Sequence, residues 1–290
     1  ETIRLPSQWA AGERIDMIMT RARINASDAG DPVEHRAEAR IGIQVLENRP
    51  DGYVFGWTVH RIEILESDPT LRAFSDNVSD LLTGIELQMK TNERGAIQSL
   101  QNLGEASLLF ESAKFGLLDS LRRNGLTPSQ YAELVLRLEG TFDASYVERS
   151  VLSQPRQLLM PAGGTYTVGK RIAYDDVVAS PFGGDPFPST GSIELTAYDE
   201  RSGVAKLAWR QIIDSGSARA ILGAILRQSE GSGMSMTVGG QPAAFSVIQE
   251  GSYEYDLVTG WPRKAVFDRR VEIGDFQESE RTTFEAVDTP

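Results

Sequence analysis

The sequence contains no cysteine and only two histidines among its 290 residues. Without cysteine, the protein has no disulfides, thiolate metal sites, iron–sulfur clusters or cysteine nucleophiles. His35 and His60 lie in different predicted strands, so they form no helical zinc pair and leave few bases for a serine triad. No apolar run reaches the ~18 residues of a membrane-spanning helix. We therefore predict no cofactor, no metal and no membrane-spanning segment.

Positive charge is also scarce, because 41 acidic residues outnumber 29 basic ones and give a net charge of −12. Arginine outnumbers lysine 24 to 5, which is typical of GC-rich bacterial genomes. A protein that binds nucleic acid through its phosphates needs a cationic face, and anionic membrane surfaces attract cationic segments. The composition of this acidic chain therefore predicts no nucleic-acid partner.

Alternating apolar and polar residues predict antiparallel strands in the first part of the chain. A first strand covers residues 13–24, and a long hairpin covers residues 36–65 with its turn at Gly52. A shorter strand pair follows at residues 85–90 and 96–100. Glycine is the natural residue at such a turn because it adopts a positive φ without steric strain.

Apolar residues at helical spacing predict four helices. One begins at Asp68, a good N-cap, and another covers residues 104–123. A third begins at Thr127, which can form a capping box with Gln130, and a fourth covers residues 215–228. We expect the helices of the middle region to form an insert between two strand-rich halves.

The second half repeats the element order of the first. A strand at residues 164–178 precedes a hairpin that turns at Gly203, and further strands cover residues 253–257, 264–273 and 282–287. This order predicts an internal duplication. We predict an α+β fold with two curved antiparallel β-sheets, the pseudo-duplicated halves, and a helical insert that covers one face. The predicted domains are 1–102, a β half with one short helix, 103–155, the helical insert, and 156–290, the second β half.

Two motifs resemble ligand-binding sites, but each also has an explanation that involves no ligand. Gly164 to Lys170 matches a phosphate-binding loop, but Arg171 replaces the Ser or Thr that would bind magnesium, and the surrounding residues are strand-like. Asp175, Asp176 and Asp185 could bind calcium or could form an acidic loop. Neither motif identifies an activity.

Aromatic stripes on the predicted strands are the remaining candidates for a site. Such a stripe forms either ordinary core or the wall of an apolar pocket, and the two interpretations differ in whether space is left over. The candidate ligand-binding residues are Tyr53, Phe55, Trp57, Phe115, Leu207, Trp209 and Tyr255.

Local patterns resemble known proteins. The run from Tyr255 to Pro262, which contains Asp256-x-x-Thr259-Gly260, resembles the terminal signature of a group of uncharacterised bacterial envelope proteins with β-rich domains. The residues 83–89 and 92–97 resemble the first-half strand and turn of that group. The plan of a curved sheet with covering helices is also similar to the periplasmic lipoprotein carriers. The resemblance implies a periplasmic location.

These observations favour a non-enzymatic extracytoplasmic bacterial protein. It would bind a hydrophobic ligand or an envelope protein in a groove between sheet and helices. A structural subunit of an envelope assembly and a carboxylate-dependent hydrolase are the alternatives. The chain begins with Glu1 rather than methionine, so we expect that a signal peptide was removed and that the protein is periplasmic or secreted.

Overall fold

The computed structural model of the chain describes most of its length. The described residues are 1–27, 30–66, 83–123, 127, 144–178, 186–214, 216, 237–238, 241–242, 245–273 and 276–287. The predicted helices that begin at Asp68 and Thr127, and almost all of the helix at 215–228, lie outside these residues.

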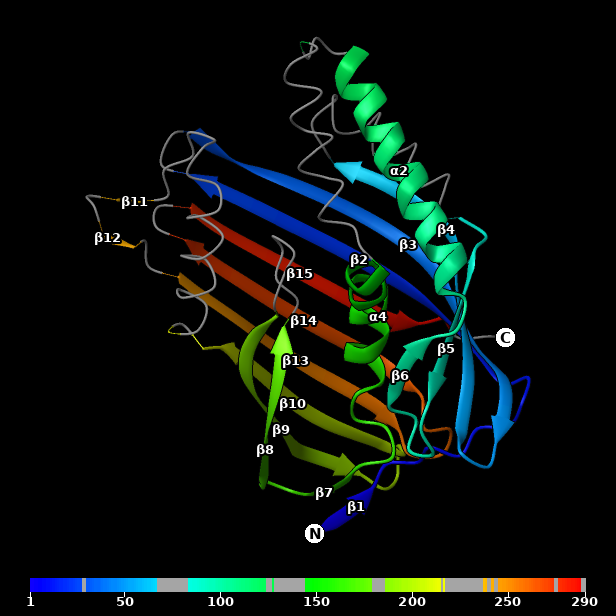
Figure 1. Cartoon of the computed structure of the whole chain (residues 1–290). Helices are drawn as coiled ribbons and strands as arrows, with labels where there is room; N and C mark the ends of the chain where they lie inside the picture. Colours follow the sequence, from blue (N-terminus) through cyan, green and yellow to red (C-terminus); the bar gives the residue numbers. More distant parts are fainter. Residues whose placement is uncertain are drawn as a thin grey trace.

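A single antiparallel sheet of 11 strands dominates the described part of the chain (Figure 1). Its strands in spatial order are β6 (Ile97–Leu100), β5 (Glu86–Thr91), β4 (Gly52–Glu66), β3 (Gly30–Arg49), β2 (Arg14–Ser27), β15 (Phe276–Ala286), β14 (Pro262–Ile273), β13 (Phe245–Asp256), β10 (Val204–Ile213), β9 (Phe187–Asp199) and β8 (Arg171–Val178). Every neighbouring pair is antiparallel. The described residues form antiparallel strands and two helices, so the predicted α+β class is supported at this coarse level.

The two predicted sheets are in fact joined. β2 of the first half pairs with β15 at the end of the chain, where Met19 lies opposite Phe284. β1 (Thr2–Arg4) likewise pairs with β7 (Thr165–Thr167), and a small hairpin is formed by β11 (Thr237–Val238) and β12 (Gln241–Pro242). The alternation of apolar residues says which side chains are buried but not which strand lies beside which, so the expectation of two separate main sheets is corrected.

The predicted hairpin turns are confirmed. Gly52 has a φ of 143°, and a Cβ at this position would collide with the carbonyl oxygen of Thr91 on the neighbouring strand. Gly203 turns β9 into β10 with a φ of 62°. Both positions therefore require glycine.

The described residues form two helices, of which α4 contacts β6 and β14 of the sheet. α2 (Leu103–Arg123) confirms the helix predicted at residues 104–123, and α4 (Ala144–Leu159) was not predicted as a separate helix. Figure 1 shows α4 in front of the central strands, with α2 beside it. In the described part of the chain, neither helix is both long and apolar enough to cross a membrane.

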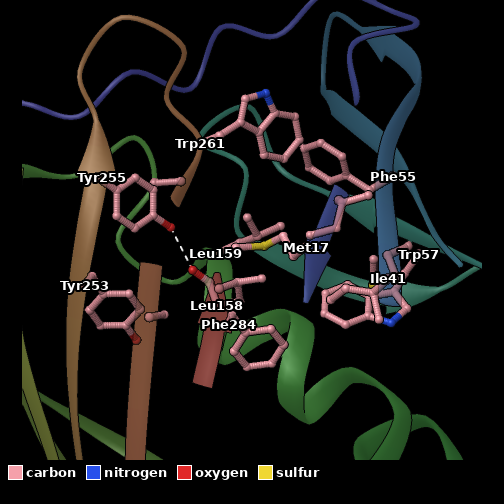
Figure 2. Close-up of a cluster of buried hydrophobic side chains, with 14 of the residues drawn as sticks. Met17, Ile41, Phe55, Trp57, Leu158, Leu159, Tyr253, Tyr255, Trp261 and Phe284 are labelled. Atoms are coloured by element: carbon pink, nitrogen blue, oxygen red, sulfur yellow. Dashed lines mark hydrogen bonds between the residues drawn. The ribbon is translucent and has the colours of Figure 1, made fainter. Parts of the chain in front are cut away.

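Polar contacts attach α4 to strands on both sides. The backbone N–H of Leu100 in β6 donates to Glu148 at 2.9 Å. At the other end, the hydroxyl of Tyr253 donates to the Gln157 carbonyl at 2.8 Å. The hydroxyl of Tyr255 donates to the Leu158 carbonyl at 2.7 Å (Figure 2). The last four carbonyl groups of a helix have no partner within the helix, so the two tyrosines stabilise the C-terminal end of α4.

Candidate functional site

A cavity of about 670 Å³ lies between the sheet and the two helices. This volume is typical of small-molecule sites, which measure roughly 300–1,000 Å³. Its outer wall is apolar and comes from β4, β5, the residue before β5, and α2. The residues of this wall are Trp57, Val59, Ile85, Leu87, Ala106, Leu109 and Phe110.

The floor of the cavity is a band across the sheet in which apolar rows give way to polar ones. Side chains two residues apart on a strand face the same way, and opposed residues form rows across the sheet. The rows are, in order, Met19–Phe284–Ala265–Tyr253–Leu207, then Arg21–Thr282–Phe267–Gly251–Trp209, then Arg23–Glu280–Arg269–Gln249–Gln211. The cavity lies over the second and third rows, where it contacts Arg21, Thr282, Phe267, Glu280, Arg269 and Gln249.

The second row is where aromatic packing ends. Gly251 has no side chain, and a Cβ there would approach Phe267 to 2.7 Å and Trp209 to 3.1 Å. The two rings therefore lie over the backbone of β13, with centroids 6.1 Å apart in an edge-to-face arrangement. Beyond these rings the floor is polar.

Most of the charged side chains on the cavity floor form ion pairs with one another. Arg21 donates to Glu280 at 2.6 Å. Arg23 and Arg269 both contact Glu278, whose side chain is 6% exposed. The distance between Arg269 Nη1 and Glu278 Oε1 is 3.5 Å. Asp268 also borders the cavity, but its carboxylate accepts two hydrogen bonds from Arg281 at 2.7 and 2.9 Å, on the opposite face of the sheet.

The third wall is α4. Arg149, Ser153 and Gln157 are four residues apart, so they form one stripe on the helix, and all three line the cavity. The Nε atom of Arg149 is buried and has no hydrogen-bond partner among the described residues. Pro155 also lines the cavity, and it lacks the N–H that would otherwise bond to the carbonyl of Val151.

Comparison with known proteins identifies no family. No family model matches the chain, and no curated protein matches it in sequence. A solved structure described as "Lipid-protein interactions in lipovitellin" matches with a TM-score of 0.46 and 7% identity. The match covers 97% of this chain and 25% of the lipovitellin chain, so this chain spans about a quarter of that protein's length. The resemblance to the bacterial envelope group stays a prediction.

The structure separates the seven candidate residues into different environments. Trp57 is 4% exposed and lines the cavity, with its ring 6.3 Å from that of Phe284. Phe115 is 61% exposed on α2. The other five candidates are buried in the core and are not among the residues that line the cavity: Tyr53, Phe55, Leu207, Trp209 and Tyr255.

Some of these buried candidates have polar atoms that are satisfied inside the protein. The hydroxyl of Tyr53 donates to the Ser7 carbonyl at 2.5 Å, and Trp209 Nε1 donates to the hydroxyl of Tyr174 at 2.5 Å. Burial raises the pKa of Tyr255 well above its usual value of 10. These contacts are those of a packed core.

Sequence analysis missed the residues that give the cavity its polarity. Arg269 and Gln249 lie on the buried face of β14 and β13, in register with apolar neighbours two residues away. An arginine at a position that alternation assigns to the core was the available signal, since such residues are rarely buried without a partner. Arg149 was hidden because α4 itself was not predicted.

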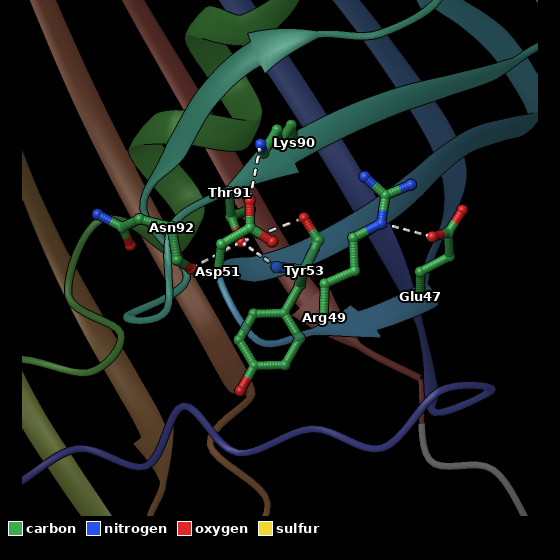
Figure 3. Close-up of polar contacts among 7 residues, drawn as sticks. All are labelled: Glu47, Arg49, Asp51, Tyr53, Lys90, Thr91 and Asn92. Carbon is green, nitrogen blue, oxygen red and sulfur yellow. Dashed lines mark hydrogen bonds and ion pairs between the residues drawn. The ribbon is translucent and has the colours of Figure 1, made fainter.

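Exposed ion pairs at the β3–β4 turn have a structural role (Figure 3). Lys90 donates to Asp51 at 3.0 Å, and Arg49 donates to Glu47 at 2.6 Å. The hydrogen bond from Lys90 lowers the pKa of Asp51, and that from Arg49 lowers the pKa of Glu47. Each carboxylate is held by one basic neighbour, which fixes the turn.

The two motifs singled out in the sequence form no complete site in the described residues. The run that begins at Gly164 forms β7 and the start of β8, not the strand–loop–helix unit of a phosphate-binding loop. Asp176 accepts a hydrogen bond from Gln211 at 3.1 Å, while Asp185 lies outside the described residues. His60 contacts Arg14 at 2.9 Å. In the described ranges, no three His, Asp or Glu residues are grouped so that they could hold a metal ion.

The residues that carry the resemblance form the β13–β14 turn. Asp256 accepts hydrogen bonds from the backbone N–H groups of Val258 at 2.7 Å and Thr259 at 2.9 Å, and from Arg263 at 2.6 Å. Gly260 has a φ of 74° and lies against the backbone of Pro6. The Asp-x-x-Thr-Gly pattern therefore builds an Asx-type turn with glycine at the position of positive φ.

Proposed function

We propose that the protein binds a hydrophobic small molecule in the cavity between the sheet and the helices α2 and α4. The observation that carries this proposal is the open space beside Trp57. A stripe that served only as core would be packed to the density of the protein interior, with few voids larger than a water molecule. The cavity instead has the volume of a ligand site and an apolar outer wall.

We further propose that the protein is not an enzyme. The ion pairs in and around the cavity support this part. Glu280 is paired with Arg21, and Asp268 is turned to the other face of the sheet, where it is paired with Arg281. A carboxylate-dependent hydrolase would need two carboxyl groups facing one another across its substrate. A periplasmic or secreted location is part of the same proposal and is supported by the resemblance alone.

The proposal is tested by obstructing the cavity. Ser153 is exposed on α4 and lines the cavity, so we expect Ser153→Trp to place an indole across the opening with little effect on stability. N-phenyl-1-naphthylamine, a neutral apolar fluorophore, is titrated into the wild type and the variant. We expect binding to weaken at least about tenfold in the variant, which corresponds to ~1.4 kcal/mol.

Ser112→Trp provides the matched control. Ser112 is exposed on α2 and its hydroxyl donates to the carbonyl of Leu108, as that of Ser153 donates to the carbonyl of Ser150. Ser112 is not among the residues that line the cavity. Equal affinities of the two tryptophan variants, or no binding of the fluorophore to the wild type, would contradict the proposal.

A further inference from the structure

The cavity has two chemically different sides, and we propose that its ligand is an anionic amphiphile of the fatty-acid class. In this arrangement an alkyl chain lies against the apolar outer wall and a carboxylate head group binds Arg149 over the polar floor. This inference rests on the proposed function and adds the chemical class of the ligand.

The apolar side accommodates the chain. Trp57, Leu87 and Phe110 come from a strand, its neighbouring strand and a helix, and together they present rings and methyl groups to the cavity. Each CH₂ group of an alkyl chain that is buried on such a wall gains favourable transfer free energy. A purely polar ligand would leave this wall exposed to water.

The opposite side is cationic, although the protein as a whole carries a net charge of −12. Three arginines and two acidic residues line the cavity. Asp268 is bound to Arg281 on the other face of the sheet, and Glu280 is bound to Arg21. Arg269 shares the carboxylate of Glu278 with Arg23. Arg149 is therefore the lining arginine for which the described residues offer no ion pair.

Arg149 is the group that most clearly lacks a partner. Within the part of the chain that the structure describes, its buried Nε atom finds no hydrogen-bond acceptor, which is unfavourable for a charged donor. The stripe that Arg149 forms with Ser153 and Gln157 lines the cavity, as do Gln249 of β13 and Arg269 of β14. Glu148, one residue away, faces β6 instead, where it binds the N–H of Leu100. Arg149 thus lines the cavity from the side of α4 that is turned away from β6.

An anionic head group satisfies this arrangement better than the alternatives. A carboxylate can accept two parallel hydrogen bonds from one guanidinium, including one from the Nε atom that lacks a partner. A neutral hydrocarbon would leave that donor unsatisfied. A cationic amphiphile would place its charge beside Arg149 and Arg269.

The test compares three head groups on one chain. Dodecanoate and dodecyltrimethylammonium, below their micellar concentrations, and dodecanol, below its solubility limit, are titrated into the full chain by calorimetry. We expect dodecanoate to bind about tenfold more tightly than dodecanol, since a hydrogen bond to a charged group contributes ~1.5 kcal/mol or more. Dodecyltrimethylammonium should bind most weakly.

Arg149→Met removes the donor and the charge while keeping an unbranched side chain. We expect it to abolish the preference for dodecanoate and to change dodecanol binding less than about twofold, because the apolar wall is intact. Arg122→Met is the control. Arg122 is exposed on α2 and is paired with Asp119 at 2.9 Å, away from the residues that line the cavity.

The outcomes separate this inference from the proposed function. Equal binding of dodecanoate and dodecanol to the wild type would overturn the head-group assignment and leave a hydrophobic site. No binding of any of the three probes, or of the neutral fluorophore, would overturn both. If Arg149→Met does not fold, as judged by circular dichroism, Arg149→Lys retains the charge but not the Nε donor. We then expect a preference reduced about threefold, and an unchanged preference would contradict the role of Arg149.

Discussion

The buried face of the sheet differs between its two ends. At the end near the β3–β4 and β13–β14 turns, aromatic rings fill the space, and Trp9 contacts Tyr53 and Phe55 at centroid distances of 5.3 Å and Trp261 at 5.1 Å. At the other end, the same strands form the polar floor of a cavity. One face of one sheet therefore serves both as solid core and as a candidate binding surface.

Single strands pass from one environment to the other. On β4, Tyr53 and Phe55 belong to the packed aromatic cluster, whereas Trp57 borders the cavity. Figure 2 shows Phe55 and Trp57 along this strand. On β14, Ala265 is fully buried and Arg269, four residues further, is on the cavity floor. An aromatic stripe identifies the buried face, but only the packing above it distinguishes core from cavity.

The strongest test of the packed end is Phe55→Ala. Phe55 is fully buried among Trp9, Tyr53 and Trp261. We expect its truncation to lower the free energy of unfolding by about 4 kcal/mol, because it removes the ring from a region with no room to relax. Urea denaturation followed by circular dichroism measures this change. A loss below about 1 kcal/mol would show that this end is not tightly packed.

Trp57→Ala tests the boundary between the two ends. One side of the ring already faces the cavity, so we expect a smaller loss of stability than for Phe55→Ala, about 3 kcal/mol, together with at least about tenfold weaker binding of N-phenyl-1-naphthylamine. Phe115→Ala is the control, because this candidate is exposed on α2. It should change neither quantity. Normal binding to Trp57→Ala would place the ligand elsewhere.

Tyr255→Phe tests how the packed end holds the helix that covers the cavity. The variant leaves the buried carbonyl of Leu158 without its donor, so we expect a loss of about 2 kcal/mol. Burial raises the pKa of Tyr255 well above 10. The unfolded chain therefore ionises first as the pH rises above 10, and the wild type should lose stability there more steeply than the variant. Tyr198→Phe is the control, because Tyr198 is only partly buried and its hydroxyl donates to the exposed Glu1; it should lose much less stability in urea denaturation at neutral pH.

Asp256→Asn gives the smallest expected effect and tests the turn at the packed end. Burial opposes ionisation of Asp256, but hydrogen bonds from the Thr259 N–H and Arg263 outweigh it and lower its pKa below 3.8. The ionised Asp256 carboxylate therefore stabilises the folded protein above pH 3.8, and this contribution is lost as the pH falls through the pKa of Asp256 in the folded state. We expect the free energy of unfolding of the variant to be about 1 kcal/mol lower at neutral pH. We also expect the stability of the variant to depend less on pH in the acid range.

Asp199→Asn is the control for that variant. Asp199 forms a similar turn through the N–H of Arg201, at 2.9 Å, in an exposed position. Thermal unfolding between pH 3 and pH 7 compares the two variants. Identical profiles for both would indicate that the Arg263 ion pair adds nothing to the turn.

Local chemistry explains which parts of the fold could be predicted. Gly52, Gly203 and the Asp256 turn depend on residues close in sequence, and the helix at 104–123 follows from apolar spacing, so these elements were predictable. α4 was harder to predict, because Pro155 interrupts its helical pattern. Its stability comes in part from distant partners, including the tyrosines of β13.

The candidate site was only partly predictable for the same reason. Trp57 was recognised as one of seven aromatic or apolar candidates, and it does border the cavity. Arg149, Arg269 and Gln249 were not recognised as candidates, since only the open space beside them makes them part of a site. A strand pattern states that a residue faces inward, and it does not state whether another side chain fills the volume above it.

Composition and interactions between near neighbours account for the strands, their buried faces, the hairpin turns and the absence of cysteine chemistry. The tertiary structure decided that β2 pairs with β15 and so unites the two halves in one sheet. It also decided that α4 rests on the tyrosines of β13 and leaves a cavity beside Trp57. These features depend on contacts between residues about 100 to 260 positions apart, for which alternation and helical spacing carry no information.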